Sequence, residues 1–392
     1  MPTGTMSPTR RGVALASLAQ RLIDPSMTES LSPQTPRPRL IAGWLFGLCA
    51  LIALMVTVGG ATRLTDSGLS ITEWDPIMGA LPPLSEAGWQ DLFEKYKQIP
   101  EYTLVNAGMT LAQFEEIFWW EWGHRNLGRF IGLYVALPLL WWSLRGTVSG
   151  PLRWRLWGLF ALVGLQGAIG WFMVASGLSD RVDVSHFRLA LHLATAFLLF
   201  GLTLLQALSL WGALQPIAAP RPVRVGLSVL MGGVFLQIIF GAFVAGLRAG
   251  KTYNTWPLMD GEVFPRGYFV GSPDFGDTVN SIAAVQFNHR LLAYVLTGVA
   301  IWLLVAVWRE HSSLRRWSAL ILAGIVLQMG LGIWTVVMAV PMALGLLHQL
   351  AALCLFGLVL TAWYRVNPAW AGRDRAPQSS PVPTSPTMST AA

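Results

Sequence analysis

The chain has 392 residues, of which 54% are hydrophobic and only 12% are charged, whereas about a quarter of the residues in a soluble domain are charged. This composition excludes a soluble enzyme, a disordered protein and a secreted disulfide scaffold, and the 39 Gly and 19 Trp are typical of membrane helices and their interfaces. The net charge of +7 is typical of basic cytoplasmic loops in a membrane protein, so no nucleic acid is expected as a partner.

Eight apolar stretches predict an all-α integral membrane protein, because roughly 20 apolar residues cross the hydrocarbon core. The second stretch, Phe130–Leu144, is short and reaches full length only if its helix starts near Ile117. Residues 1–39 and 366–392 are rich in Pro, Ser, Thr and Arg and predict disordered cytoplasmic tails. The other seven stretches are Leu40–Val58, Leu156–Leu178, Leu189–Leu214, Val225–Leu247, Leu291–Trp308, Trp317–Met338 and Ala343–Tyr364.

Loop charges predict the orientation of the chain. Basic residues gather in the two tails and in the loops after the second, fourth and sixth spans, so both termini are expected in the cytoplasm. The two long loops, about Gly59–Glu116 (residues 59–116) and Arg248–Phe287, then lie outside. We expect a multi-pass protein of the bacterial plasma membrane, because residues 1–39 contain no convincing amphipathic helix; the alternative is the mitochondrial inner membrane, with this tail as a presequence.

An internal repeat relates residues 40–214 to residues 215–365. Four helices in each half is an even number, so the halves keep one orientation and are predicted to be two parallel four-helix-bundle repeats. The matching segments are Gly59-Gly60-Ala61 with Phe240-Gly241-Ala242, Trp74-Asp75-Pro76-Ile77-Met78 with Trp256-Pro257-Leu258-Met259, Gly123-His124-Arg125-Asn126-Leu127 with Asn288-His289-Arg290-Leu291-Leu292, Leu165-Gln166 with Leu327-Gln328, and His192 with His348.

Four of the six histidines lie near the outer start of an even-numbered span, at similar depth, whereas His186 and His311 fall in predicted loops. An ionisable side chain inside a membrane is costly and indicates function. A single such histidine is as often a packed, hydrogen-bonded residue, but two matching pairs favour a ligand-binding site. The four residues are His124, His192, His289 and His348.

Two imidazoles on facing helices suit a haem iron, which they can ligate from opposite sides. A bare zinc or copper ion would need three or four clustered ligands, and each half offers only two histidines with at most one carboxylate. Arg125, Arg129 and Arg290 lie beside the expected ligands and are candidates to bind the haem propionates. The alternative for these arginines is snorkelling at the membrane interface.

The halves differ three residues before the first histidine of each pair. Glu121 precedes His124 and shares its helix face, whereas Gln286, which cannot ionise, precedes His289. An acid beside a haem can move protons or stabilise positive charge that develops during oxidation. The alternative is that Glu121 caps the first turn of its helix.

These residues resemble the haem A synthase family over about residues 40–365. The most specific elements are Glu121-Trp122-Gly123-His124-Arg125, the loop of residues 59–70 (GGATRLTDSGLS), and Glu73-Trp74-Asp75-Pro76. The resemblance implies an eight-helix oxidoreductase that converts the C8 methyl group of haem O to the formyl group of haem A, for terminal cytochrome oxidase assembly. It also implies that His289 and His348 are the axial ligands of a resident haem b, that His124 and His192 ligate the haem O substrate, and that Glu121 is the catalytic acid.

The chain lacks the paired outer-loop cysteines of some relatives, and Cys49 and Cys354 are expected to be small apolar packing residues. Expected partners are membrane lipid, haem O, a haem O synthase docked on the outer loops, and an electron acceptor that the sequence does not identify; a homo-oligomer stays open. Two other functions fit the histidine pairs: a di-haem b-type electron carrier and a haem transporter.

Overall fold

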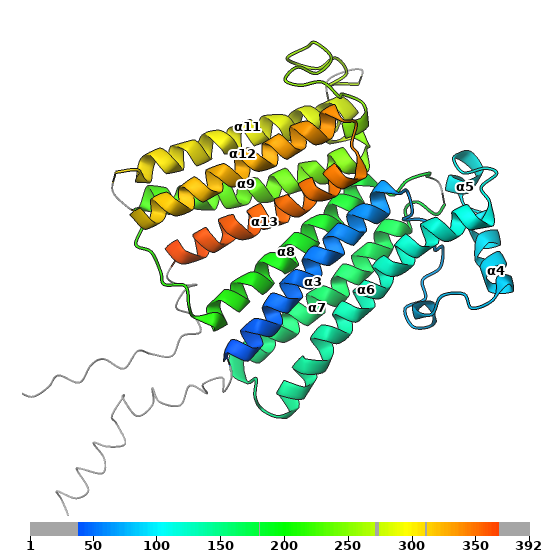
Figure 1. Cartoon of the computed structure of the whole chain (residues 1–392), viewed down its shortest axis with the longest axis horizontal. Helices are drawn as coiled ribbons and strands as arrows, with labels where there is room; N and C mark the ends of the chain where they lie inside the picture. Colours follow the sequence, from blue (N-terminus) through cyan, green and yellow to red (C-terminus); the bar gives the residue numbers. More distant parts are fainter. Residues whose placement is uncertain (1–37, 180, 271–273, 310–311, 368–392) are drawn as a thin grey trace, which may run out of the picture.

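The computed structural model describes residues 38–179, 181–270, 274–309 and 312–367. Within these residues eight helices are long and apolar enough to cross a membrane, which confirms the predicted all-α membrane fold (Figure 1). Residues 1–37 and 368–392, which make up almost all of the predicted tails, lie outside the described residues, and so does His311. The spanning helices are α3 (Pro38–Leu64), α6 (Leu111–Leu144), α7 (Gly150–Val174), α8 (His186–Trp211), α9 (Arg221–Gly246), α11 (Ile282–Val307), α12 (Ser312–Val337) and α13 (Met342–Val366).

The spanning helices pack as two groups of four. In the first group α3, α6, α7 and α8 contact one another in a closed ring, and in the second α9, α11, α12 and α13 do the same. The groups meet where α8 contacts α9 and where α13 contacts α3 and α8, so α8 is the most buried spanning helix. The description of these groups as parallel repeats related by an axis along the membrane normal stays a prediction.

Helix α6 begins earlier than its sequence predicted. Thr110 accepts a hydrogen bond from the backbone of Gln113, and the Gln113 side chain accepts one from the backbone of Thr110. This capping box satisfies otherwise unpaired N–H groups and starts the helix at Leu111 instead of near Ile117. Glu121 therefore lies in the third turn of α6, and the alternative that it caps the first turn is wrong.

One end of the helix bundle carries both long connections and is called the loop end here (Figure 1). The first connection contains η2 (Met78–Ala80), α4 (Glu86–Tyr96) and α5 (Pro100–Leu104), and the second contains η3 (Ala249–Lys251) and α10 (Asp277–Asn280). Both are shorter than expected, because α3 continues to Leu64, and α6 and α11 start at Leu111 and Ile282.

The first connection has a small hydrophobic core of its own. Buried Phe93 and Tyr96 of α4 pack on Phe114 and Phe118 at the start of α6, with ring centroids 5.2 Å apart for both Phe93–Phe114 and Tyr96–Phe114. Aromatic side chains bury large apolar areas and hold such an element in place. The connection is therefore a folded cap on the extended end of α6.

Two further expectations were wrong in detail. His186 is the first residue of α8 and not a loop residue, and its Nε2 lies 3.1 Å from Oδ1 of Asn280. Cys49 is buried in the core as expected, but Cys354 lies on an exposed face of α13. The backbone conformation at Ser185, which starts α8 at the next residue, has no clear signal in the sequence. The exposure of Cys354 depends on how α13 is rotated about its axis, and an apolar sequence does not specify that rotation.

Candidate functional site

The four membrane histidines lie at the loop end of four different helices: His124 on α6, His192 on α8, His289 on α11 and His348 on α13. Each is partly buried. His124 and His192 lie close enough to interact electrostatically, and so do His289 and His348. The structure therefore brings the residues together in the two predicted pairs, one in each group of helices.

Each histidine ring lies against a glycine of the preceding spanning helix. A Cβ atom placed on the glycine would stand 2.9 to 3.2 Å from Cε1 of the imidazole, which is closer than an ordinary van der Waals contact. The glycines therefore leave the space that the rings occupy. The four pairs are Gly59 with His124, Gly170 with His192, Gly241 with His289, and Gly332 with His348.

Three of the histidines also receive a hydrogen bond at their backbone carbonyl from a glutamine. The amide Nε2 lies 2.9 Å from the carbonyl oxygen in all three pairs: Gln166 with His192, Gln237 with His289, and Gln328 with His348. Sequence comparison of the halves found Gln166 and Gln328 but missed Gln237. The signal was present, since Leu236-Gln237 precedes Gly241 at the same spacing as in the other two helices.

These residues fit a haem in each group of helices. Paired imidazoles on facing helices are the donor set that haem iron takes on its two axial sides. Among the described residues, Nδ1 of His124, Nδ1 of His289 and Nη1 of Arg290 are buried without a hydrogen-bond partner. Because buried polar atoms are nearly always paired, these atoms are available to a polar or charged ligand.

Glu121 is buried, and both of its carboxylate oxygens accept hydrogen bonds. Oε2 accepts from Oγ of Ser70 and from the backbone N–H of Ile71, each at 2.8 Å, and Oε1 accepts from Nη2 of Arg125 at 2.7 Å. Charge-assisted bonds of this length are strong. The carboxylate therefore ties the first connection to α6, three residues before His124.

Gln286, at the corresponding place on α11, also binds its connection, but it donates hydrogen bonds where Glu121 accepts them. Its Nε2 donates to the carbonyl oxygens of Ala249 at 3.1 Å and Tyr253 at 3.2 Å. An amide can donate these bonds and a carboxylate cannot. Each group of helices thus holds its own loop, but only the first does so with an ionisable acid.

The three arginines considered for propionate binding already contact loop carbonyls. Arg125 donates to Ile71 and Glu73, and Arg129 donates to Asp75 and Pro76. Arg290 donates through Nη2 to Tyr253 at 3.1 Å, while its Nη1 is one of the unpaired atoms noted above. Of the three, Arg290 has the free donor that best fits an anionic group.

A charged cluster joins the two groups of helices at the loop end. Arg248, just after α9, contacts Asp66 at 2.9 Å and Asp183 at 3.0 Å, both from the first group. Arg63 contacts the same two aspartates at 3.2 and 3.3 Å. Two arginines and two aspartates alternate in this cluster, so each charge has opposite charges as neighbours.

One buried carboxylate of the first connection has an unusual pKa. Glu101 on α5 accepts a hydrogen bond from the Tyr96 hydroxyl at 3.1 Å, and Asn106 donates to that hydroxyl at 2.7 Å. Burial, with smaller contributions from nearby carboxylates, raises the pKa of Glu101 to about 7, and burial also raises the pKa of Tyr96. Glu101 therefore titrates near neutral pH.

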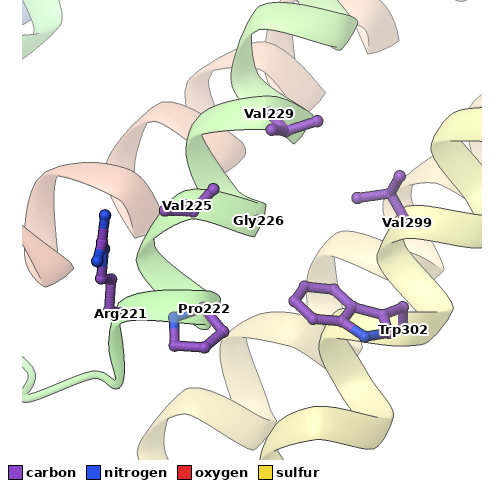
Figure 2. A pocket seen from close by; sticks show the side chains of 7 residues that line it. All are labelled: Arg221, Pro222, Val225, Gly226, Val229, Val299 and Trp302. Carbon is purple, nitrogen blue, oxygen red and sulfur yellow. The ribbon is translucent and has the colours of Figure 1, made fainter.

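A separate cavity of about 450 Å³ lies at the other end of the bundle, between α9 and α11 (Figure 2). Apolar side chains line it, including Val225, Val229 and Trp302, with Arg221 at its rim. These residues lie near the start of α9 and the end of α11, whereas the histidines lie at the loop end. The cavity is therefore distinct from the histidine sites.

Comparisons with known proteins agree with the site. A sequence model of the cytochrome oxidase assembly protein family COX15-CtaA matches residues 42–360. The chain is 49% identical over 334 residues to the heme A synthase of Maricaulis maris, which covers 83% of this chain and 96% of the relative. It is 47% identical over 344 residues to that of Caulobacter vibrioides, with 87% and 99% covered, and 50% identical over 320 residues to that of Azorhizobium caulinodans, with 80% and 90% covered. The chain belongs to the COX15-CtaA family of cytochrome oxidase assembly proteins.

Proposed function

We propose that this protein is a haem A synthase, which oxidises the C8 methyl group of haem O to the formyl group of haem A for the assembly of a terminal oxidase. The observation that carries the proposal is the presence of two histidine pairs at the loop end of a multi-pass membrane protein of this family. The curated relatives are heme A synthases and match the chain over most of its length.

The two pairs take different roles in this proposal. His124 and His192 hold the haem O substrate, because Glu121, the ionisable acid, lies on the helix of His124. His289 and His348 would hold a resident haem b, and Arg290 would bind one of its propionates. When bound, this haem would supply one-electron transfer between the substrate site and an external acceptor.

Glu121 is the acid of the reaction in this proposal. Conversion of a methyl group to a formyl group replaces two C–H hydrogens by one oxygen atom, and these hydrogens leave as protons and electrons. A fixed carboxylate can accept such protons or stabilise positive charge on the substrate. Ser70, Ile71 and Arg125 hold the carboxylate in one orientation, so it does not have to reorganise during the reaction. Gln286 cannot take this role, which agrees with a resident haem in the second group.

The loop charges and the bacterial relatives support a proposal for the cellular setting of the enzyme. We infer a bacterial plasma membrane with both termini in the cytoplasm, so that the loop end faces outward. The cap formed by α4 and α5 is then available to a haem O synthase. Deletion of this segment would remove Phe93 and Tyr96 from the loop core, so Leu84→Ser and Leu104→Ser, at two exposed positions, are the better variants for a pull-down with that partner. Equal recovery with the wild type would count against docking there.

Expression in a host that makes haem O but no haem A tests the activity directly. The haems are extracted and separated by chromatography and mass. Haem A among the products supports the synthase and excludes a permanent di-haem electron carrier and a haem transporter. Haem b and haem O alone, with folded protein and a membrane electron acceptor supplied, would overturn the proposal.

A further inference from the structure

The contact between a glutamine and a histidine carbonyl occurs with the same spacing in three helix pairs. In each, the glutamine precedes by four residues the glycine that lies under the imidazole, so one helix turn presents both contacts. The pairs are α7 with α8, α9 with α11, and α12 with α13, through Gln166, Gln237 and Gln328. The contact therefore accompanies ligand histidines and not one particular helix.

The partner helices share a feature that makes this contact accessible. In an α-helix the carbonyl of a residue already accepts the N–H four residues later, and the side chain of that later residue lies beside it. In the three helices that side chain is a methyl group, from Ala196, Ala293 and Ala352. The free lone pair of each histidine carbonyl is thus open to the glutamine amide.

The amide also lies next to the imidazole ring. Nε2 of Gln166 is 3.1 Å from Nδ1 of His192, Nε2 of Gln237 is 3.4 Å from Nε2 of His289, and Nε2 of Gln328 is 3.2 Å from Nδ1 of His348. Among the described residues, Oε1 of each glutamine is buried and has no partner. The Nε2 of each amide therefore lies beside both the backbone carbonyl and the ring of its histidine.

The fourth histidine lacks this partner. Four residues before Gly59 on α3 stands Met55, whose methyl carbon lies 3.5 Å from the position of a Cβ on Gly128. Gly128 follows His124 by four residues, so Met55 occupies the place of the glutamines. A thioether cannot donate a hydrogen bond, and within the described part of the chain no side chain of α3 donates to the carbonyl of His124.

We propose that Gln166, Gln237 and Gln328 are positioning residues that fix the axial histidines, and that Met55 leaves His124 less firmly held so that its haem can exchange. The proposal rests on the proposed function, in which His124 serves a haem that enters as substrate and leaves as product. Both ligands of the resident haem have a glutamine, whereas only one ligand of the substrate haem has one. Ligands fixed before binding lose less conformational freedom and bind more tightly, and partners that orient metal ligands typically change affinity about 10- to 100-fold.

The test uses the full-length, haem-loaded protein in detergent and follows the transfer of haem to excess apomyoglobin. Gln237→Met is expected to accelerate the loss of haem b about tenfold or more and to change the low-spin ferric EPR signal and the midpoint potential of that haem. Met55→Gln is expected to slow the release of haem O by a similar factor. If Gln237→Met does not fold, Gln328→Met tests the other ligand of the same haem.

Gln349→Met is the matched control. Gln349 is also an amide in a spanning helix, but it donates to Val56 at 3.1 Å and not to a histidine carbonyl. Its variant is expected to keep the wild-type rate of haem transfer and the wild-type EPR signal. Equal haem loss from Gln237→Met and wild type, or equal acceleration by Gln349→Met, would overturn the proposal.

The haem-transfer experiment can support or reject the positioning role independently of whether the protein is a haem A synthase. Faster haem loss from Gln237→Met in a protein that forms no haem A would keep the positioning role and reject the synthase. Formation of haem A together with unchanged haem transfer in Gln237→Met and Met55→Gln would keep the synthase and reject the positioning role.

Discussion

Glu121 and Arg125 form an ion pair one turn apart on α6, with 2.7 Å between Oε1 and Nη2. The corresponding positions on α11 hold Gln286 and Arg290, whose side chains are 3.3 Å apart. Both arginines donate to the carbonyl of a loop residue, Ile71 in the first group and Tyr253 in the second. The two sites thus share a loop attachment and differ by one negative charge beside the histidine.

Glu121→Gln is expected to keep bound haem while lowering haem A formation about 100-fold or more, because an amide cannot accept a proton at neutral pH. The variant also disturbs the loop, since the amide nitrogen can no longer accept from Ser70 or Arg125. Extracted haems and the haem-to-protein ratio measure both effects.

Ser70→Ala is the control for the loop, because it removes one hydrogen bond to the carboxylate and leaves its charge. It is expected to cost about 1.5 to 3 kcal/mol of loop attachment and to retain most haem A formation. A loss of activity as large as that of Glu121→Gln would mean that Glu121 acts through the loop and not on the substrate.

His348→Ala and His289→Ala are expected to deplete the resident haem, because each removes one of its two proposed axial ligands. His192→Ala is expected to leave the haem b content near that of the wild type and to reduce binding of haem O. The pyridine haemochrome spectrum per mole of protein distinguishes these results. Equal depletion of haem b by all three variants would contradict the assignment of the pairs.

Gly241→Ala is expected to weaken haem b binding about tenfold through displacement of its ligand. The added methyl would stand 3.2 Å from Cε1 of His289, so the ring has to move. Gly232→Ala is the control on the same helix, since nothing among the described residues lies within 4 Å of its added methyl. Haem content after purification gives the comparison, and equal content in the two variants would contradict a role for the glycine contact.

Glu101 is expected to make the cap of α4 and α5 less stable as pH rises. The folded-state pKa of about 7 is above the ordinary glutamate value of 4.5, so the folded cap binds the proton more tightly than the unfolded segment. The stability is full below pH 4.5 and falls until pH 7, and the loss above that pH is about 3 kcal/mol. Hydrogen exchange of residues 86–106 at pH 5.5 and pH 8 measures it.

Glu101→Gln should remove most of this pH dependence and protect the cap at pH 8, because the amide carries no charge to bury. Glu116→Gln, at an exposed position of α6, should leave the dependence unchanged. A cap with equal exchange at both pH values in the wild-type protein would show that Glu101 does not titrate in this range.

Arg248→Met is expected to weaken the junction between the two groups of helices by about 1 kcal/mol, because these partly exposed charges are screened by water. The change leaves Asp66 and Asp183 with Arg63 as their shared partner. The melting temperature in detergent should fall by a few degrees, and the additional change Asp183→Asn should restore part of it. A melting temperature equal to that of the wild type would show that the cluster does not stabilise the junction.

Much of the architecture was predictable from local features of the sequence. A spanning helix needs only length and apolar composition, so all eight spans were predicted. The pairing of histidines was predictable because matching positions in two similar halves lie at similar depth. The start of α6 was not predicted, because the capping box of Thr110 and Gln113 lies in a polar segment that continues beyond the apolar stretch.

The contacts around the histidines were not predictable, because they depend on how each helix is rotated against its neighbour. The neighbouring sequence does not show which group a glycine or a glutamine in an apolar stretch will contact, and Gln237 was missed for this reason. Two of the partners of Glu121, Ser70 and Ile71, come from a loop about 50 residues earlier in the chain. Such contacts form only when the loop folds over the helix ends.

The sequence alone therefore determined a membrane protein with eight spans, two histidine pairs and one acid beside one pair, because hydropathy, spacing and charge are local properties. The tertiary structure decided which groups those residues contact: a glycine under each ring, a glutamine on three of the four histidine carbonyls, and a loop on the carboxylate of Glu121. The physical reason is that the rotation of packed helices and the closing of loops are settled by the summed packing of distant segments, and no short stretch of sequence contains that information.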